Sequence, residues 1–262
     1  MSSHTTPADP EPSSGPASAP VRKRPSRRAA WPPVSEIRWD DTHRLIPGVY
    51  ADTDEPLLAA LADEEADIPD LVALAAATNP RLAAQANVLP TGIHQDELVF
   101  GVPHWRIVNA AFCHPHPLGS RFNGPDRGAW YAGQHIETSL AEVAYHRTIE
   151  LAEIDRWELR AEYQDYVADV HAPLHDLRRP RDRRARACLA PDSYTTSQAV
   201  AADLLANGSV GIVYPAVRDP GREALACFRP ASVANVRTGG RYTLTWSGGP
   251  TPTVEPTIQP AT

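Results

Sequence analysis

Both ends of this chain are rich in proline and poor in side chains that a core could bury. In residues 1–28 the prolines are Pro7, Pro10, Pro12, Pro16, Pro20 and Pro25, set among Ser, Ala and Arg. From Ser247 to Thr262 the same composition returns, with Pro250, Pro252, Pro256 and Pro260. Burial of apolar side chains is what offsets the entropy lost when a chain becomes ordered. We therefore predict that residues 1–28 and 247–262 are disordered and that the fold lies between them.

Charge limits the partners that this chain is expected to bind. Its formal net charge is −7, whereas a surface built for nucleic acid or anionic lipid needs a concentrated positive field. Two arginine-rich runs, residues 22–28 and 178–186, lie in polar, proline-containing contexts that are typical of solvated surface. We expect neither a nucleic-acid partner nor a membrane partner.

The sequence gives no sign of a membrane span, which needs about 20 apolar residues, or of a signal peptide at its start. Cys113, Cys188 and Cys227 are too few and too scattered to form a disulfide framework. These features favour a soluble protein of a reducing compartment, the cytoplasm.

Residues 29–97 are interpreted as an N-terminal extension. An apolar stretch over residues 36–50 predicts an extended lead-in strand that ends near Pro47. Apolar residues at helical spacing then predict two short helices, over residues 55–65 and 69–77. This alanine-rich pair indicates a packing or partner surface rather than chemistry.

Residues 98–246 are predicted to form one domain of strands and helices. Strands are predicted around residues 105–108, 130–131, 157–170, 210–214, 225–228 and 242–246, and helices over residues 137–151 and 197–205. Short strands around two helices predict a compact α+β fold with a mixed, partly antiparallel sheet.

Four side chains between residues 106 and 142 suit a dinucleotide with a cationic leaving group. Arg106 lies in an apolar run, and Arg121, Tyr131 and Glu142 follow it across a turn, a strand and a helix. Two guanidinium groups can hold a pyrophosphate through paired hydrogen bonds. A tyrosine ring can stack on nicotinamide, and a carboxylate near the ribose can stabilise the oxocarbenium-like transition state of glycosidic cleavage. Taken singly, each residue also has an ordinary role, as an ion pair, a core aromatic or a solvated carboxylate.

A series of motifs strengthens this interpretation. WRIV, SRFNG, GAWYAG and ETSLAEVAYHR, followed by GIVYPAVRDPG and ACFRP, resemble the RES family over about half of the chain and in the right order. The resemblance implies a compact α+β fold similar to that of ADP-ribosylating toxins, and an activity that degrades NAD. It also implies a role as the toxin of a toxin–antitoxin pair, with an antitoxin protein as partner.

The resemblance also assigns roles to individual residues. The family's two arginines, strand tyrosine and helix glutamate correspond to Arg106, Arg121, Tyr131 and Glu142. By this assignment the arginines orient the pyrophosphate of NAD, the tyrosine holds nicotinamide, and the glutamate stabilises the ribosyl cation that water or inorganic phosphate captures. NAD is then a substrate, and no cofactor is implied. His146 matches a histidine in one branch of the family, although a local contact on the helix face suits it equally well.

The chain departs from the family pattern at one position, where Ala216 replaces the serine of YPSVR. One hydrogen bond to a charged group is worth roughly 1.5 to 3 kcal/mol, so the missing hydroxyl is expected to weaken binding or turnover. A weakened or inactive member that only binds NAD or an antitoxin is therefore an alternative to an active enzyme. Transfer of ADP-ribose onto a protein is a second alternative.

Other motifs are less informative. Cys113, His114 and His116 form a CHPH cluster, but its spacing matches no standard zinc pattern and no second pair follows. No Walker loop, GxGxxG turn or GxSxG elbow is present. We expect no metal, and the oligomeric state, a homo-oligomer included, stays open.

Overall fold

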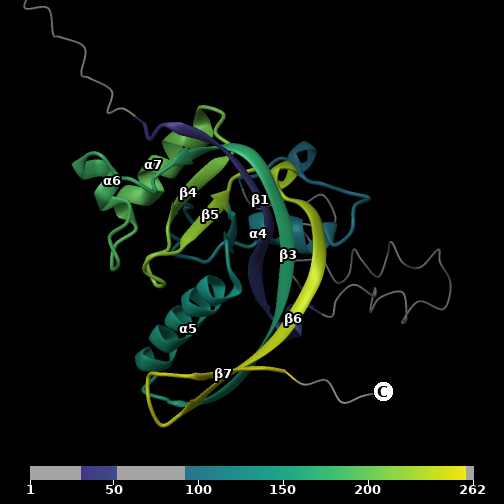
Figure 1. The fold of residues 1–262 in the computed structure, drawn as a ribbon, viewed down its shortest axis with the longest axis vertical. Coiled ribbons are helices and arrows are strands. Elements are labelled where there is room, and N and C mark those ends of the chain that lie inside the picture. Colours follow the sequence, from purple (N-terminus) through teal and green to yellow (C-terminus); the bar gives the residue numbers. More distant parts are fainter. Residues whose placement is uncertain (1–30, 52–91, 258–262) are drawn as a thin grey trace, which may run out of the picture. The chain divides into compact units, whose positions relative to one another are not determined.

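Figure 1 shows the computed structural model, which describes residues 31–51 and 92–257. In these residues seven strands form one sheet, and they are β1 (Val34–Pro47), β2 (Trp130–Gly133), β3 (Glu158–Asp176), β4 (Gly211–Pro215), β5 (Glu223–Cys227), β6 (Ala234–Ser247) and β7 (Thr253–Pro256). The α-helices are α1 (Gly48–Ala51), α4 (Trp105–Cys113), α5 (Ile136–Glu153), α6 (Arg183–Ala187) and α7 (Thr195–Ala206). Two 3₁₀ turns are η2 (Gln95–Glu97) and η3 (Pro230–Ser232).

The sheet has the strand order β1-β2-β5-β4-β3-β6-β7, and β1 also pairs with β3. This extra pairing closes a circuit through β1, β2, β5, β4 and β3, because each of these strands is hydrogen-bonded to the next. The pairings are antiparallel except for the short parallel contact of β3 with β4. This closed arrangement of strands brings β1 beside β2 and α5, which follow β1 in the sequence after 80 or more residues.

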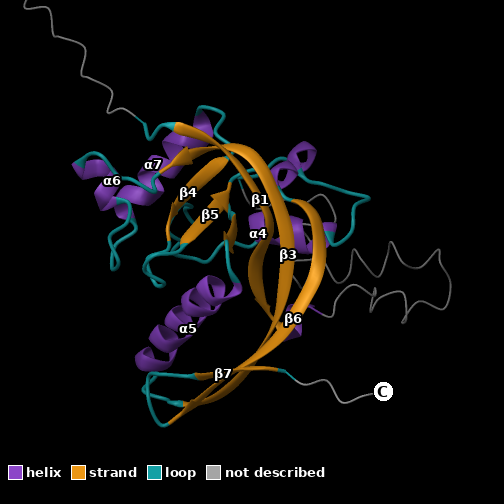
Figure 2. Ribbon diagram, viewed as in Figure 1, coloured by secondary structure: helices purple, strands orange, loops and turns teal. Residues whose placement is uncertain are grey.

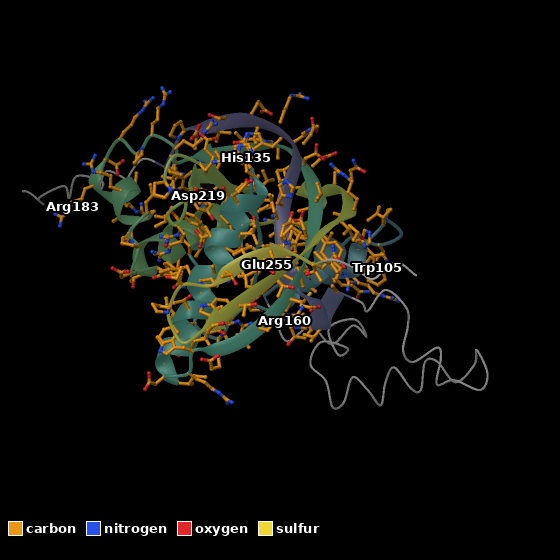
Figure 3. The ribbon with its side chains drawn as sticks, turned by 60° about the horizontal axis from the view of Figure 1, so that its bottom comes forward. Trp105, His135, Arg160, Arg183, Asp219 and Glu255 are labelled. Atoms are coloured by element: carbon orange, nitrogen blue, oxygen red, sulfur yellow. The ribbon has the colours of Figure 1, made fainter. Side chains whose placement is uncertain are left out.

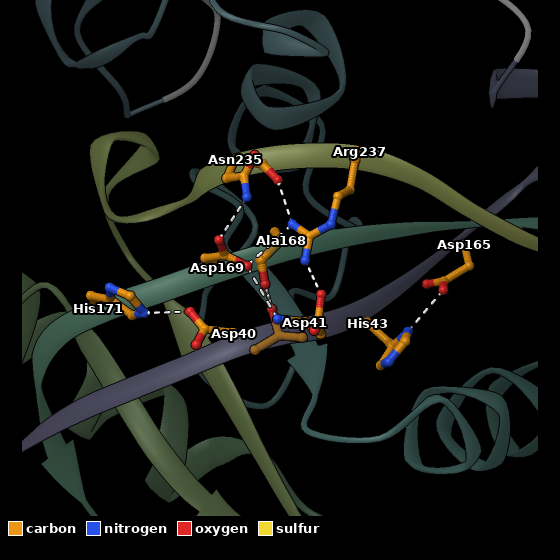
Figure 4. Close-up of polar contacts among 10 residues, drawn as sticks. Asp40, Asp41, His43, Asp165, Ala168, Asp169, His171, Asn235 and Arg237 are labelled. Atoms are coloured by element: carbon orange, nitrogen blue, oxygen red, sulfur yellow. Dashed lines mark hydrogen bonds and ion pairs between the residues drawn. The ribbon is translucent and has the colours of Figure 1, made fainter.

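The three longest strands, β1, β3 and β6, lie side by side and curve together (Figure 1). Their register shifts at a bulge in β1 between Trp39 and Thr42. There Asp41 has a positive φ of 57°, and its backbone N–H donates to Asp169 Oδ1 at 3.1 Å. Arg237 of β6 bonds both of these aspartates (Figure 4). A bulge increases the local bend of a strand, and these charged contacts hold it across three strands.

The helices cover different parts of the sheet (Figure 2). Helix α5 contacts β1 and β2, whereas α4 contacts β2 and η3. Buried side chains of α4, chiefly Ile107, Val108 and Phe112, pack into the largest core cluster with β2, β3 and β5. A separate cluster between α5 and the long strands contains Leu151 and Trp246. No helix among the residues that the structure describes is both long and apolar enough to span a bilayer.

The predicted α+β class with a mixed, partly antiparallel sheet is confirmed. The expected lead-in strand corresponds to β1, and the expected helices over residues 137–151 and 197–205 correspond to α5 and α7. The strand structure expected between residues 157 and 170 corresponds to one strand, β3. The helices expected over residues 55–65 and 69–77 lie outside the described residues, as does the segment 1–28.

The strand predicted around residues 105–108 is wrong, because these residues open α4. Ile107, Val108, Ala111 and Phe112 are buried at a spacing that fits one face of a helix. A short apolar run has no periodicity of its own that separates a strand from a buried helix. The run Trp105–Val108 is such a case, and tertiary packing decides it.

The disorder predicted for residues 247–262 is wrong for the part that the structure describes, which ends at Thr257. Strand β7 pairs with β6 from Thr253↔Thr245 to Pro256↔Tyr242, and the Thr257 N–H donates to the Arg241 carbonyl at 2.7 Å. The residues of β7 are exposed. Backbone pairing with an existing edge strand can therefore order a segment that has little to bury. Residues 258–262 lie outside the description.

Candidate functional site

A cavity of about 320 Å³ lies between the curved sheet and α5. Its size is within the range of small-molecule sites. The lining comes from β1 (Arg44, Leu45, Pro47), the loop before β2 (Ser120, Arg121), β2 (Tyr131, Ala132, Gly133), α5 (Thr138, Ser139, Glu142, Val143, His146, Arg147, Glu150) and Tyr163, Tyr194, Tyr214 and Ala224. Elements far apart in the sequence therefore build one hollow that contains guanidinium, carboxylate and aromatic groups.

Most of the residues selected from the sequence lie together in this cavity. Arg121, Tyr131, Glu142 and His146 all line it, and so does Tyr214 of β4. Arg106 and Ala216 are not among the lining residues. The roles assigned to the lining residues remain predictions.

Arg121 is buried, with 5% of its surface exposed, and is held rigidly. Its Nη1 donates to the carbonyls of Ala190 at 2.7 Å and Cys188 at 3.3 Å, and its guanidinium lies 4.7 Å from the centre of the Tyr194 ring. Its Nη2 is buried without a hydrogen-bond partner in the described part of the chain. An unpaired buried N–H costs about 1 to 3 kcal/mol, so an anion that fills this position would bind favourably.

Arg44 is the functional candidate that the sequence analysis missed. It lies on β1, lines the cavity, donates from Nη1 to the Tyr131 carbonyl at 3.2 Å and stacks 4.9 Å from the centre of the Trp130 ring. Its Nε is buried and has no partner among the described residues. Burial lowers the pKa of Arg44 to about 10, so the guanidinium stays charged at neutral pH. Arg44 and Arg121 therefore place two cationic groups at one cavity, and each has a buried N–H without a partner in the described residues.

Tyr131 uses its hydroxyl group to fix the loop that carries Arg121. The hydroxyl accepts from the Phe122 N–H and donates to Asn123 Oδ1, both at 2.8 Å. Burial raises the pKa of this tyrosine above its ordinary value, so the hydroxyl remains protonated and keeps donating to Asn123. The hydroxyl of Tyr131 thus makes positioning contacts within the protein, while the residue lines the cavity.

Glu142 lies in the middle of the α5 face that lines the cavity. Glu142, His146 and Glu150 recur at intervals of four residues, which places them on one side of a helix. The Glu142 side chain is 27% exposed, and its Oε2 is 3.5 Å from His146 Nε2. Burial, followed by the charge of Glu142, raises the pKa of Tyr214 well above its ordinary value. Tyr214 is therefore a neutral hydroxyl near a carboxylate that remains accessible from the cavity.

The start of α5 is fixed against β1 and β2 by Ser139. Its Oγ donates to the His43 carbonyl at 2.7 Å and accepts from the Gly133 N–H at 3.1 Å. A Cβ at Gly133 would lie 2.8 Å from the Thr138 Cβ and 2.9 Å from Ser139 Oγ, so only glycine allows this close approach. These contacts set the start of α5 against β1 and β2, and Glu142 lies about one helical turn beyond Ser139.

The prediction that Arg106 shares a site with the other three residues is wrong. Arg106 lies on α4, with its guanidinium 5.1 Å from the centre of the Trp105 ring. Figure 3 shows Trp105 well away from His135 and Asp219, which flank the start of α5. The error follows from the helix that replaces the expected strand, because α4 turns this side chain away from its buried face.

Ala216 is also outside the cavity lining. It is 4% exposed and belongs to an apolar cluster with Phe122 and Tyr214, and its N–H donates to the Arg222 carbonyl at 2.9 Å.

The CHPH cluster contributes no set of metal ligands, since no group of three or more His, Cys, Asp or Glu side chains in the described ranges could hold a metal ion.

The cavity, with Arg44 and Arg121 on one side and Glu142 of α5 on the other, forms a candidate ligand site in an α+β domain. The RES domain model matches residues 99–247, which is more than half of the chain, and the chain therefore belongs to the RES family. Arg44 precedes the matched region. A family match alone could not have identified it.

Among solved structures, the chain resembles one described as the crystal structure of the M. tuberculosis MbcT-MbcA toxin-antitoxin complex. The identity is 16%, the match covers 80% of this chain and 87% of the other, and the TM-score is 0.43. A likeness at this level says nothing of activity. A search of curated proteins gives no match.

Proposed function

We propose that this protein cleaves the nicotinamide–ribose bond of NAD in the cavity between β1 and α5. One observation carries the proposal: Arg44 and Arg121 line the same cavity as Glu142, and each has a buried guanidinium N–H without a partner in the described residues. Membership of the RES family supports NAD as the substrate. Two fixed cations suit the two charges of a pyrophosphate, and the carboxylate suits the cation that forms on the ribose.

The reaction needs little from the protein beyond positioning and charge. The bond between the ribose carbon and the ring nitrogen breaks, and its electron pair stays with nicotinamide, which leaves as a neutral base without a general acid. The positive charge that develops on the ribose is stabilised by Glu142. Water or inorganic phosphate then forms the new C–O bond, and water releases its proton to the solvent.

We further propose that this activity is that of a toxin in a toxin–antitoxin pair. Depletion of NAD would stop growth, and an antitoxin protein would bind the chain to prevent it. The motifs that resemble the RES family support this role. Induction of the chain in a bacterial host, with NAD measured before growth stops, tests it.

The chemical proposal is tested by incubating the purified protein with NAD, with and without phosphate, and measuring free nicotinamide. We expect release by the wild type and a loss of about a hundredfold in Glu142→Gln, because a preorganised charge near the reacting centre contributes on that order. Glu153→Gln is the matched control, since Glu153 is exposed on the same helix and does not line the cavity.

The product identifies the acceptor, because ADP-ribose forms with water and its 1″-phosphate forms with phosphate. Label transferred from NAD to a protein would identify the transferase alternative instead. Equal release by the wild type and Glu142→Gln would refute the role of the carboxylate. Binding of NAD without any release would refute cleavage.

A further inference from the structure

The cavity has two chemically different ends. At one end β1 and α5 meet through the contact of the His43 carbonyl with Ser139 Oγ, next to Arg44. At the other end Arg147 Nε donates to the Tyr163 hydroxyl at 3.3 Å, and Tyr163 pairs with Pro47 at the end of β1. The strand and the helix therefore run along the cavity together. A helix rises about 1.5 Å per residue, so Ser139 and Arg147 are about 12 Å apart, with Glu142 between them.

The far end, defined by Pro47, Tyr163, Arg147 and Glu150, offers a donor and an acceptor side by side. Arg147 Nη1 lies 2.6 Å from Glu150 Oε2. The contacts of Arg147 with Tyr163 and Glu150 use Nε, Nη1 and Oε2, so Nη2 and Oε1 take no part in them. Glu150 neutralises the charge of Arg147. The ring of Tyr163, which is 4% exposed, and Pro47 supply the apolar part of this wall.

We infer that the far end binds a planar ring that bears a carboxamide, and that it is the nicotinamide subsite of the cavity; this inference rests on the proposed function. The carboxamide oxygen accepts from Arg147 and its NH₂ donates to Glu150. Glu142 places a carboxylate on the same helix face as the cationic ring, which favours the pyridinium of the substrate. Tyr131 lies at the Arg44 end of the cavity, and its hydroxyl is already bonded to Phe122 and Asn123. We therefore assign the nicotinamide to the far end.

This arrangement makes Glu150 a specificity-determining residue. A nicotinic acid ring has a carboxylate in place of the carboxamide. One of its oxygens can accept from Arg147, but the other has no N–H to donate and lies against the Glu150 carboxylate. The Glu150 side chain is 55% exposed, which weakens the discrimination through solvent screening. We expect NAD to be preferred over nicotinic acid adenine dinucleotide by about tenfold, equivalent to about 1.4 kcal/mol.

The experiment compares kcat/KM for NAD and for nicotinic acid adenine dinucleotide in the wild type, Glu150→Gln and the control Glu153→Gln. The glutamine keeps an acceptor but removes the charge, so we expect the preference to fall from about tenfold to about threefold or less in Glu150→Gln. The control should keep the wild-type ratio. An unchanged ratio in Glu150→Gln, or a wild type that does not discriminate, overturns the inference.

A binding measurement separates this inference from the proposed function. The two dinucleotides are titrated calorimetrically into Glu142→Gln and into Glu142→Gln combined with Glu150→Gln, where turnover is slow. ADP-ribose, which lacks nicotinamide, is titrated in parallel to report on the arginine end alone. Binding of ADP-ribose without discrimination between the dinucleotides overturns the subsite and leaves the proposed function standing. Failure of all three ligands to bind overturns both.

Discussion

Two regions of this molecule place arginine in similar sequence surroundings and use it differently. Arg44 precedes Leu45 and Ile46 in the cavity region, formed by β1 and α5, and Arg106 lies between Trp105 and Ile107 in the α4 region, residues 92–113. On the strand the guanidinium reaches the cavity and keeps a free N–H. On the helix the guanidinium stacks on its neighbour Trp105. An arginine within an apolar run therefore indicates a ligand site only when the secondary structure around it is known.

The α4 region has polar groups that are satisfied internally. Glu97 of η2 forms paired hydrogen bonds with Arg127 at 2.7 and 2.8 Å and also bonds Arg229. Asn109 of α4 bonds both backbone groups of Val99. These contacts tie the segment before α4 to the rest of the domain. The arginines Arg44 and Arg121 of the cavity region differ because they line the cavity, whereas Arg127 and Arg229 pair with the Glu97 carboxylate.

Substitution of Arg44 and of Arg106 should give the largest difference between the two regions. In Arg44→Met we expect the affinity for ADP-ribose to fall by about a hundredfold, because a hydrogen bond to a charged group is worth up to about 3 kcal/mol. In Arg106→Met the affinity should stay within about twofold, since the side chain lies outside the cavity. Isothermal titration of both variants measures the difference. Equal losses, or a larger loss in Arg106→Met, would contradict the site described here.

The sequence predicts most of the elements but not how they meet. Helix α5 and the strands that follow it have clear periodicity, and Glu142 is predicted from its place on α5. Arg121 and Tyr131 are identified instead by the motifs SRFNG and GAWYAG. Arg44 does not, because its place in the cavity depends on the long-range pairings of β1 with β3 and of His43 with Gly133. Neither pairing leaves a local signal. The one local indication of Arg44 as a site residue is its place next to apolar residues in the predicted lead-in strand.

The contact of Glu97 with Arg127 in the α4 region should stabilise the protein less in acid than at neutral pH. The hydrogen bond from Arg127 lowers the pKa of Glu97 from 4.5 to about 2. A pKa that is depressed in the folded state stabilises the protein above the unfolded value, and this stabilisation is lost as the pH falls from about 4.5 to about 2. Loss of this contact should cost about 2 kcal/mol at pH 7, because it leaves Arg127, which is 8% exposed, without its carboxylate.

Urea unfolding of the wild type and Glu97→Gln at several pH values measures this effect. The difference in the free energy of unfolding should be largest at neutral pH and should shrink below pH 4.5, while the affinity for ADP-ribose at pH 7 stays unchanged. A constant difference across the pH range would show that Glu97 acts through its shape rather than its charge. A large loss of affinity for ADP-ribose in Glu97→Gln would show that the α4 region belongs to the functional site.

The smallest effect is expected at Ala216, where the family has serine. Because Ala216 packs against apolar neighbours and lies outside the cavity lining, a hydroxyl there has no path to a ligand in the cavity. Ala216→Ser should leave kcat/KM for NAD within about twofold and lower the free energy of unfolding by about 1 kcal/mol, the cost of burying a poorly paired hydroxyl. Nicotinamide release and urea unfolding measure the two quantities. A gain of about tenfold or more in kcat/KM would instead mean that position 216 acts on the substrate, and that the alanine weakens the natural enzyme.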